Sequence, residues 1–188
     1  GYYLMFNGTP AIPPLAGAHS TTTFVGSAAE LQACAAVNMT GVLWVVNVFV
    51  DPHNSSALWP GWEARWAAYW AAVEPHAHAI LAIYPQDEPS AGLIDSGAFG
   101  TIVRAIKRTA PSIPIATVLS VGSVQGIKAD TYSLPPGVDW IGFDQYGCWD
   151  RPGCVADCDL PGSGGCCYGA CFPAHDNRSI PHNLAVLR

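Results

Sequence analysis

The stretch Ala79-Ile-Leu-Ala-Ile-Tyr-Pro-Gln-Asp-Glu-Pro-Ser90 carries two adjacent carboxylates shortly after an apolar run of strand length. Residues 79–84 are almost continuously hydrophobic, a pattern typical of a parallel strand that is buried on both faces. The acidic residues that follow, Asp87 and Glu88, are therefore expected at the carboxyl end of a buried strand.

Similar apolar runs alternate with helical patterns along the chain. Strands are predicted at residues 2–6, 22–25, 41–50, 115–119 and 140–143, in addition to 79–84. Helices are predicted over residues 28–36, 62–74 and about 91–109, where apolar or aromatic side chains recur on one face. Ser27 and Glu30 form a capping box at the start of the first helix. This alternation predicts an α/β fold with a parallel sheet.

The number and order of these elements predict an incomplete (β/α)8 barrel. Six strands can be assigned, and none follows residue 143. A complete barrel takes about 250 residues, whereas this chain has 188. We therefore expect one partial, TIM-barrel-like domain over residues 1–188, truncated at its C-terminus. A Cys- and Gly-rich loop at residues 148–177 follows the sixth strand within it.

The composition excludes several classes of protein. Half of the residues are hydrophobic and only 12% are charged, which argues against a disordered chain. The net charge of −6 and the pI of about 5.3 leave no basic surface for nucleic acid. No apolar run reaches the roughly 18 residues that a membrane span needs. A neutral or weakly polar ligand is expected, and no cofactor.

Six of the seven cysteines fall within one short segment. They are Cys148, Cys154, Cys158, Cys166, Cys167 and Cys171. Zinc is a competing interpretation, but the segment lacks a clean pair of C-x2-C knuckles, so disulfides that staple the loop are favoured and no metal is expected. Six cysteines leave fifteen pairings open. The remaining cysteine, Cys34, is expected to be a free thiol buried by its helix.

Four Asn-X-Ser/Thr sequons point to the same cellular route as the cysteines. They begin at Asn7, Asn38, Asn54 and Asn177. Sequons are glycosylated only in a secretory pathway, where disulfides also persist. The two features together favour an extracellular, vacuolar or cell-wall protein.

The chemistry of the opening stretch depends on where its carboxylates stand. In a barrel, side chains at the carboxyl ends of strands line the active site. A carboxyl beside a buried sheet can hold a proton near neutral pH and so act as a general acid. Glu88 suits that role, with Asp87 as its orienting neighbour. The alternative is a plain helix start, with Asp87 as N-cap and Pro89 at the first helical position.

The same residues resemble a known family of enzymes. Asp87-Glu88-Pro89 is similar to the fourth-strand motif of retaining (β/α)8 glycosidases in the cellulase-like clan, where Asn-Glu or Asp-Glu supplies the acid/base. Residues 138–147 resemble the sixth strand of such barrels. The resemblance covers roughly residues 1–150 as an ordered pattern. It implies a carbohydrate substrate, with Glu88 as the acid/base that protonates the glycosidic oxygen.

The resemblance also implies a second carboxylate, the nucleophile, at the end of a seventh strand. No such strand is found, so the favoured expectation is a fragment that is inactive by itself. If the chain is complete, Asp144 at the end of the sixth strand is the best available partner. The distance between the Glu88 and Asp144 carboxyl groups would then decide whether the configuration at the anomeric carbon is retained or inverted. It is about 5–5.5 Å for retention and about 6.5–9.5 Å for inversion. An Asx turn is an equally good interpretation of Asp144.

Further polar and aromatic residues follow the predicted strands and are candidates for substrate binding. They are Asp87, Asn47, Asp51, His53, Trp59, Tyr146 and Trp149. Asn47 is also explained as a core amide with a hydrogen-bond partner, and the aromatic residues are as often packing residues as sugar platforms. His76 and His78 precede the fourth strand and are better explained as structural or surface residues than as metal ligands.

Three functions remain open from the sequence. The leading one is hydrolysis of O-glycosidic bonds in a polysaccharide or glycoconjugate. The second is a carbohydrate-binding barrel without catalysis. The third is a metal-dependent barrel hydrolase that uses Asp51, His53, Glu88 and Asp144.

Overall fold

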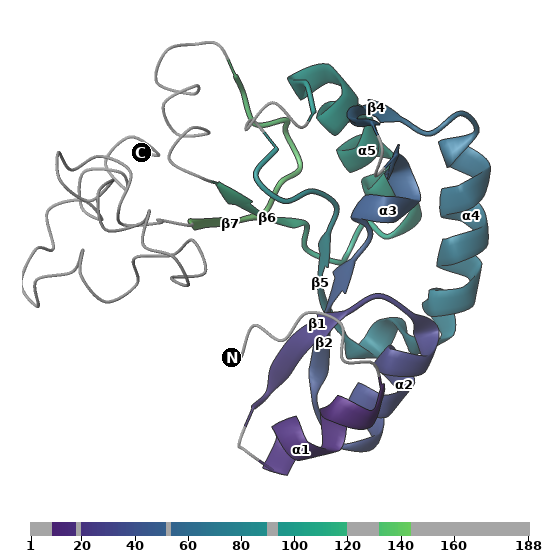
Figure 1. The fold of residues 1–188 in the computed structure, drawn as a ribbon, viewed down its shortest axis with the longest axis vertical. Helices are drawn as coiled ribbons and strands as arrows, with labels where there is room; N and C mark the ends of the chain where they lie inside the picture. Colours follow the sequence, from purple (N-terminus) through teal and green to yellow (C-terminus); the bar gives the residue numbers. More distant parts are fainter. Residues whose placement is uncertain (1–8, 18–19, 52–53, 90–93, 120–131, 144–188) are drawn as a thin grey trace, which may run out of the picture. The chain divides into compact units, whose positions relative to one another are not determined.

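The computed structural model describes residues 9–17, 20–51, 54–89, 94–119 and 132–143 (Figure 1). The chain divides by its internal contacts into two units, Gly1–Phe143 and Asp144–Arg188. All described residues belong to the first unit, so the architecture below is that of the first unit alone. The predicted strand at residues 2–6 and the predicted loop at residues 148–177 lie outside the described residues.

Helices and strands alternate along this unit. In chain order they are η1 (Thr9–Ala11), α1 (Ile12–Gly17), β1 (Thr22–Val25), α2 (Ala28–Ala36), β2 (Thr40–Trp44), α3 (Val46–Phe49), β3 (Val50–Asp51), β4 (Asn54–Leu58), α4 (Trp62–Val73), η2 (Glu74–Ala79), β5 (Ile80–Tyr84), α5 (Ser96–Thr109), β6 (Ala116–Leu119) and β7 (Trp140–Phe143).

The parallel strands lie side by side in the order in which the chain makes them. β1 pairs with β2 and β2 with β5, while β6 pairs with β7. Parallel bridges from Ile83 to Ile115 and from Asp87 to Val118 connect β5 to the β6 segment. The short strands β3 and β4 form a separate antiparallel hairpin. The α/β class with parallel strands is therefore confirmed, and the described strands show no closed barrel.

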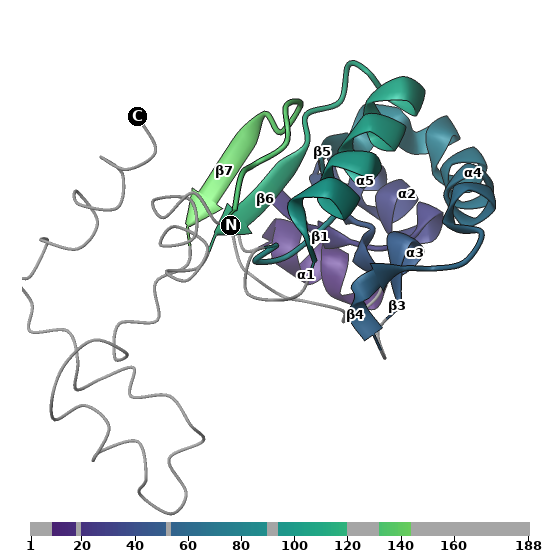
Figure 2. The ribbon, with the colours of Figure 1, turned by 90° about the horizontal axis from the view of Figure 1, so that it is seen from above.

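One face of the parallel strands packs against the helices. Val25, Leu43 and Ile83 occupy matching positions on neighbouring strands and are buried. They share one apolar core with side chains of α2, α4 and α5, which lie grouped together in Figure 2. Since the helices cover this face, the residues between, such as Phe24 and Trp44, face the other side and are only partly buried.

Several predicted elements match the structure closely. The strands at residues 22–25 and 140–143 have the predicted bounds, and β5 and β6 each begin one residue later than predicted. Ser27 caps α2, its hydroxyl accepting from the Glu30 amide at 3.3 Å. The Glu30 carboxylate returns to the amide of Gly26 at 2.8 Å. The predicted capping box at the start of α2 is therefore confirmed, with one hydrogen bond from each of the two side chains to a backbone amide.

The predicted strand at residues 41–50 is wrong in its second half. β2 ends at Trp44, and the chain turns through α3 before the hairpin begins. This turn brings Phe49 against the α4 aromatic stripe, with ring centroids 5.7 Å from Trp62 and 5.2 Å from Trp66. Phe49 is fully buried as a result. Tertiary packing of one large ring thus overrides the strand propensity of a Val-rich run.

The third helix also begins later than predicted. α5 starts at Ser96 rather than near residue 91, because Asp95 is its N-cap. The Asp95 carboxylate accepts hydrogen bonds from the amides of Gly97 at 2.8 Å and Ala98 at 2.9 Å. Asp87 therefore does not cap this helix, and the interpretation of Asp87-Glu88-Pro89 as the start of the third helix is wrong.

Candidate functional site

Three aromatic rings cluster at the carboxyl ends of neighbouring strands. Trp44 and Tyr84 end β2 and β5 and are paired in register, so their rings stack at 5.2 Å between centroids. Phe24 of β1 meets both rings edge-on, at 5.9 Å from Trp44 and 5.3 Å from Tyr84. This aromatic cluster was not predicted. Its signal in the sequence is an aromatic residue at or next to the last position of three successive parallel strands.

Asp87 is anchored to this cluster by a hydrogen bond. The Tyr84 hydroxyl donates to the Asp87 carboxylate at 2.5 Å. The backbone around Asp87 is fixed as well, since its carbonyl accepts from the Gln86 amide group at 3.0 Å. The hydroxyl of Thr117 on β6 donates to the Gln86 carbonyl at 2.9 Å. The carboxylate thus has a defined position at the end of β5.

Glu88 follows directly and is half-buried. Its amide donates to the Val118 carbonyl of β6 at 3.1 Å, which continues the pairing between β5 and β6 beyond Tyr84. Its φ of 42° lies in the left-handed region, which residues with a Cβ seldom adopt. Such strained backbone occurs preferentially at functional sites, where the surrounding structure holds it in place.

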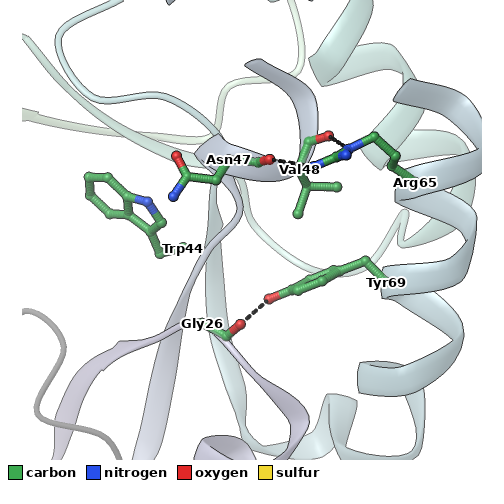
Figure 3. Close-up of a pocket in the computed structure, with 6 residues that line it drawn as sticks. All are labelled: Gly26, Trp44, Asn47, Val48, Arg65 and Tyr69. Carbon is green, nitrogen blue, oxygen red and sulfur yellow. Dashed lines mark hydrogen bonds between the residues drawn. The ribbon is translucent and has the colours of Figure 1, made fainter. Parts of the chain in front are cut away.

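A pocket of about 400 Å³ opens beside Trp44. We call it the Arg65 pocket, and it is lined by Gly26, Trp44, Asn47, Val48, Arg65 and Tyr69 (Figure 3). The Arg65 guanidinium donates from Nε to the Val48 carbonyl at 3.4 Å and from Nη2 to the Asn47 carbonyl at 3.3 Å. Its Cζ also lies 4.7 Å from the centroid of the Trp59 ring, a cation–π contact.

Tyr69 lies one turn after Arg65 on α4 and lines the same side of the Arg65 pocket (Figure 3). Its hydroxyl donates to the Gly26 carbonyl at 3.1 Å. Burial raises the pKa of the Tyr69 phenol well above its ordinary value, and the nearby Glu30 carboxylate raises it further. The hydroxyl therefore stays protonated at any physiological pH. It holds α4 against the loop after β1.

The structure brings together only part of the predicted site. Asp87 bonds to Tyr84 of the aromatic cluster and Glu88 follows it in the chain. Asn47 lies at the Arg65 pocket on α3, exposed rather than buried as a core amide. Trp59 packs against Arg65, and its role in substrate binding stays a prediction. Several predicted site residues lie outside the described residues and have no structural outcome here. They are His53, Asp144, Tyr146, Trp149, Cys148, Cys154, Cys158, Cys166, Cys167 and Cys171.

Three remaining predictions concern residues outside the aromatic cluster and the Arg65 pocket. Cys34 is confirmed as a free, buried cysteine, and burial together with Glu30 raises the pKa of its thiol to about 11. Asp51, half-buried, ends the two-residue strand β3. His76 and His78 lie in the 3-10 helix η2 before β5. Within the described part of the chain, no three His, Cys, Asp or Glu side chains gather in a way that could hold a metal ion.

Comparison with protein-family models, curated proteins and solved structures finds no match for this chain. Among the described residues, no helix has both the length and the apolar character to cross a membrane.

Proposed function

We propose that this chain is a secreted glycoside hydrolase of the (β/α)8-barrel type, which cleaves O-glycosidic bonds of a polysaccharide or glycoconjugate with Glu88 as acid/base. The observation that carries the proposal is the Asp87 carboxylate, held by Tyr84 of three clustered aromatic rings, with Glu88 next to it in a left-handed backbone after β5. Parallel strands that neighbour one another in chain order are also what a barrel of this type is built from. This arrangement supports the barrel interpretation.

In the proposed reaction, Glu88 donates its proton to the oxygen of the leaving sugar as the bond to the anomeric carbon breaks. The Glu88 carboxylate then takes a proton from the water that completes hydrolysis. Asp87, held by the Tyr84 hydroxyl, is placed to accept a hydrogen bond from a sugar hydroxyl. Asp144 is the candidate for the second carboxylate and lies outside the described residues.

The test is hydrolysis by the full chain of a panel of neutral and acidic polysaccharides, measured as release of reducing ends. With Asp144 as the second carboxylate, in place of the nucleophile expected on a seventh strand, we expect turnover by the parent protein. We also expect a loss of about 100-fold or more in Glu88→Gln, the range that general acid catalysis contributes. Glu74→Gln is the matched control, because Glu74 is an exposed carboxylate on η2. Absence of turnover, or equal activity of Glu88→Gln and the parent, would contradict the proposal.

The aromatic cluster favours a second candidate, carbohydrate binding without catalysis. Aromatic rings such as Phe24 and Trp44, which are only partly buried, can stack on the apolar face of a sugar. This alternative predicts that oligosaccharides change the tryptophan fluorescence of the parent and of Glu88→Gln equally. It also predicts that neither protein releases reducing ends.

A further inference from the structure

We propose that the Arg65 pocket binds the carboxylate of an acidic sugar, so that the substrate is a glycan containing uronic acid residues. The inference rests on the proposed function, because it names the class of substrate that the same edge of the sheet would take. It differs from the sequence-based expectation of a neutral ligand.

The charge at the pocket is unusual for this molecule. The chain has a net charge of −6, and the cations of the described residues other than Arg65 all lie on α5. Lys107 on that helix is paired with Asp139. Among the described residues Arg65 forms no ion pair with a carboxylate. A guanidinium that has no acidic partner and lines a pocket is available to an anionic ligand.

The guanidinium is also oriented before any ligand arrives. Two of its five N–H groups donate to the Val48 and Asn47 carbonyls of α3, and the Trp59 ring packs against it. Within the described part of the chain, the other three N–H groups make no hydrogen bond and can be offered to a ligand. The planar fork of arginine matches the two oxygens of a carboxylate. A prearranged fork loses less freedom on binding than a mobile side chain does.

The remaining walls suit a sugar ring. Trp44 and Tyr69 supply aromatic surface, and the exposed Asn47 side chain supplies an amide that can both donate and accept hydrogen bonds. The volume of about 400 Å³ falls in the range of small-molecule sites, about 300–1,000 Å³. A single guanidinium also matches the single charge of a carboxylate better than the double charge of a phosphate monoester.

Trp44 joins the pocket to the proposed catalytic residues. Trp44 is a lining residue of the pocket, and its ring stacks on Tyr84, whose hydroxyl holds Asp87. Glu88 is the next residue. Trp44 thus connects the pocket to the residues that hold Asp87, an arrangement compatible with neighbouring positions along one glycan chain.

The test compares ligands that differ only in charge. The full-length Glu88→Gln protein, in which turnover of the ligand is expected to be about 100-fold slower or more, is titrated with uronic acid oligosaccharides. It is also titrated with the same oligosaccharides after reduction of their carboxyls to primary alcohols. Binding is followed by calorimetry and tryptophan fluorescence. We expect the acidic form to bind more tightly, by about tenfold or more, the value of a hydrogen-bonded charge pair.

The variants assign this preference to Arg65. Adding Arg65→Gln should weaken the acidic ligand about tenfold or more and leave the reduced ligand unchanged. Arg104→Gln is the control, since it removes the same charge from an exposed position on α5. Arg65→Lys keeps the charge without the fork, so an intermediate affinity is expected. Thermal unfolding of each variant shows whether the fold is kept.

Three results would overturn the inference: equal binding of acidic and reduced ligands, an unchanged preference in Arg65→Gln, or inorganic phosphate binding as tightly as the acidic sugar. The outcome is separable from that of the proposed function. Hydrolysis of neutral glycans, with no preference for binding the acidic over the reduced oligosaccharides, would agree with the proposed function and contradict this inference. Arg65-dependent binding without hydrolysis by the parent would leave the pocket assignment and remove the function.

Discussion

The backbone at Glu88 is left-handed, and it is fixed by β6 rather than by a helix. Its amide bonds to the Val118 carbonyl, and the bridge between Asp87 and Val118 holds the preceding residue. A left-handed conformation costs an L-residue with a Cβ about 1–2 kcal/mol. The backbone angles, held by these two contacts to β6, set the direction in which the Glu88 side chain leaves the backbone.

This strain predicts an inverted order of stability for two substitutions. Glu88→Gly should have a free energy of unfolding about 1 kcal/mol higher than Glu88→Ala, because glycine adopts a φ of 42° without a Cβ clash. At Glu74, where φ is −52°, alanine should instead be more stable than glycine by about 0.5–1 kcal/mol. Urea unfolding measures both pairs. The same order at both positions would contradict the assigned backbone conformation.

Individual site residues differed in how far the sequence could predict them. The position of Asp87 and Glu88 after a buried strand followed from the apolar run before them. Arg65 and Tyr69 could not be found in the same way, because both lie on a helix whose aromatic periodicity indicates only packing. Their role depends on α3, which brings the carbonyls of Asn47 and Val48 to Arg65.

The elements themselves were predictable where a local signal was strong. Ser27 and Glu30 mark the start of α2, and the spacing of aromatic residues marks α4. The chain after Trp44 was not predictable, since the sequence Val45-Val-Asn-Val-Phe49 has strand propensity throughout. The burial of Phe49 between helix and sheet decides its conformation, and that contact is long-range. Local patterns carry no information about it.

The starts of β6 and β7 are tied to α5 by one carboxylate. Asp139 accepts hydrogen bonds from Lys107 at 2.7 Å and from the Ile115 amide at 2.8 Å. The hydrogen bond from Lys107 lowers the pKa of Asp139 most, followed by the bond from the Ile115 amide. Burial raises this pKa, and the positive charge of Lys107, the last of the four causes, lowers it. The ionised form is therefore favoured in the folded state.

The lowered pKa of Asp139 determines how the free energy of unfolding changes with pH. The stabilisation by Asp139 is present above the pKa of about 3.8 that the unfolded chain has, and it is lost as the pH falls through the lower, folded value. Asp139→Asn should reduce the free energy of unfolding at pH 7 by about 1 kcal/mol, discounted for the exposure of the pair. Denaturant unfolding between pH 2 and pH 7 measures this. A difference that persists undiminished in acid would refute the ion pair.

The first unit as a whole presents one covered face and one partly open face of parallel strands. Helices from three crossovers bury the covered face, while Phe24 and Trp44 lie on the other. The sequence predicted the class and the order of these strands, because buried parallel strands and amphipathic helices leave distinct patterns. Whether the strands close into a barrel depends on pairing between distant parts of the chain, which the same patterns do not encode.

The most direct test of the central claim measures how the effect of Glu88→Gln on kcat/KM depends on the leaving group of the substrate. A glycoside with a dinitrophenolate leaving group departs without protonation, whereas the same sugar joined to another sugar needs a general acid. We predict that kcat/KM for the sugar–sugar linkage falls by about 100-fold or more, and that kcat/KM for the dinitrophenyl glycoside falls far less. Glu74→Gln should change neither. Equal losses on both substrates would contradict the assignment of Glu88 as the general acid.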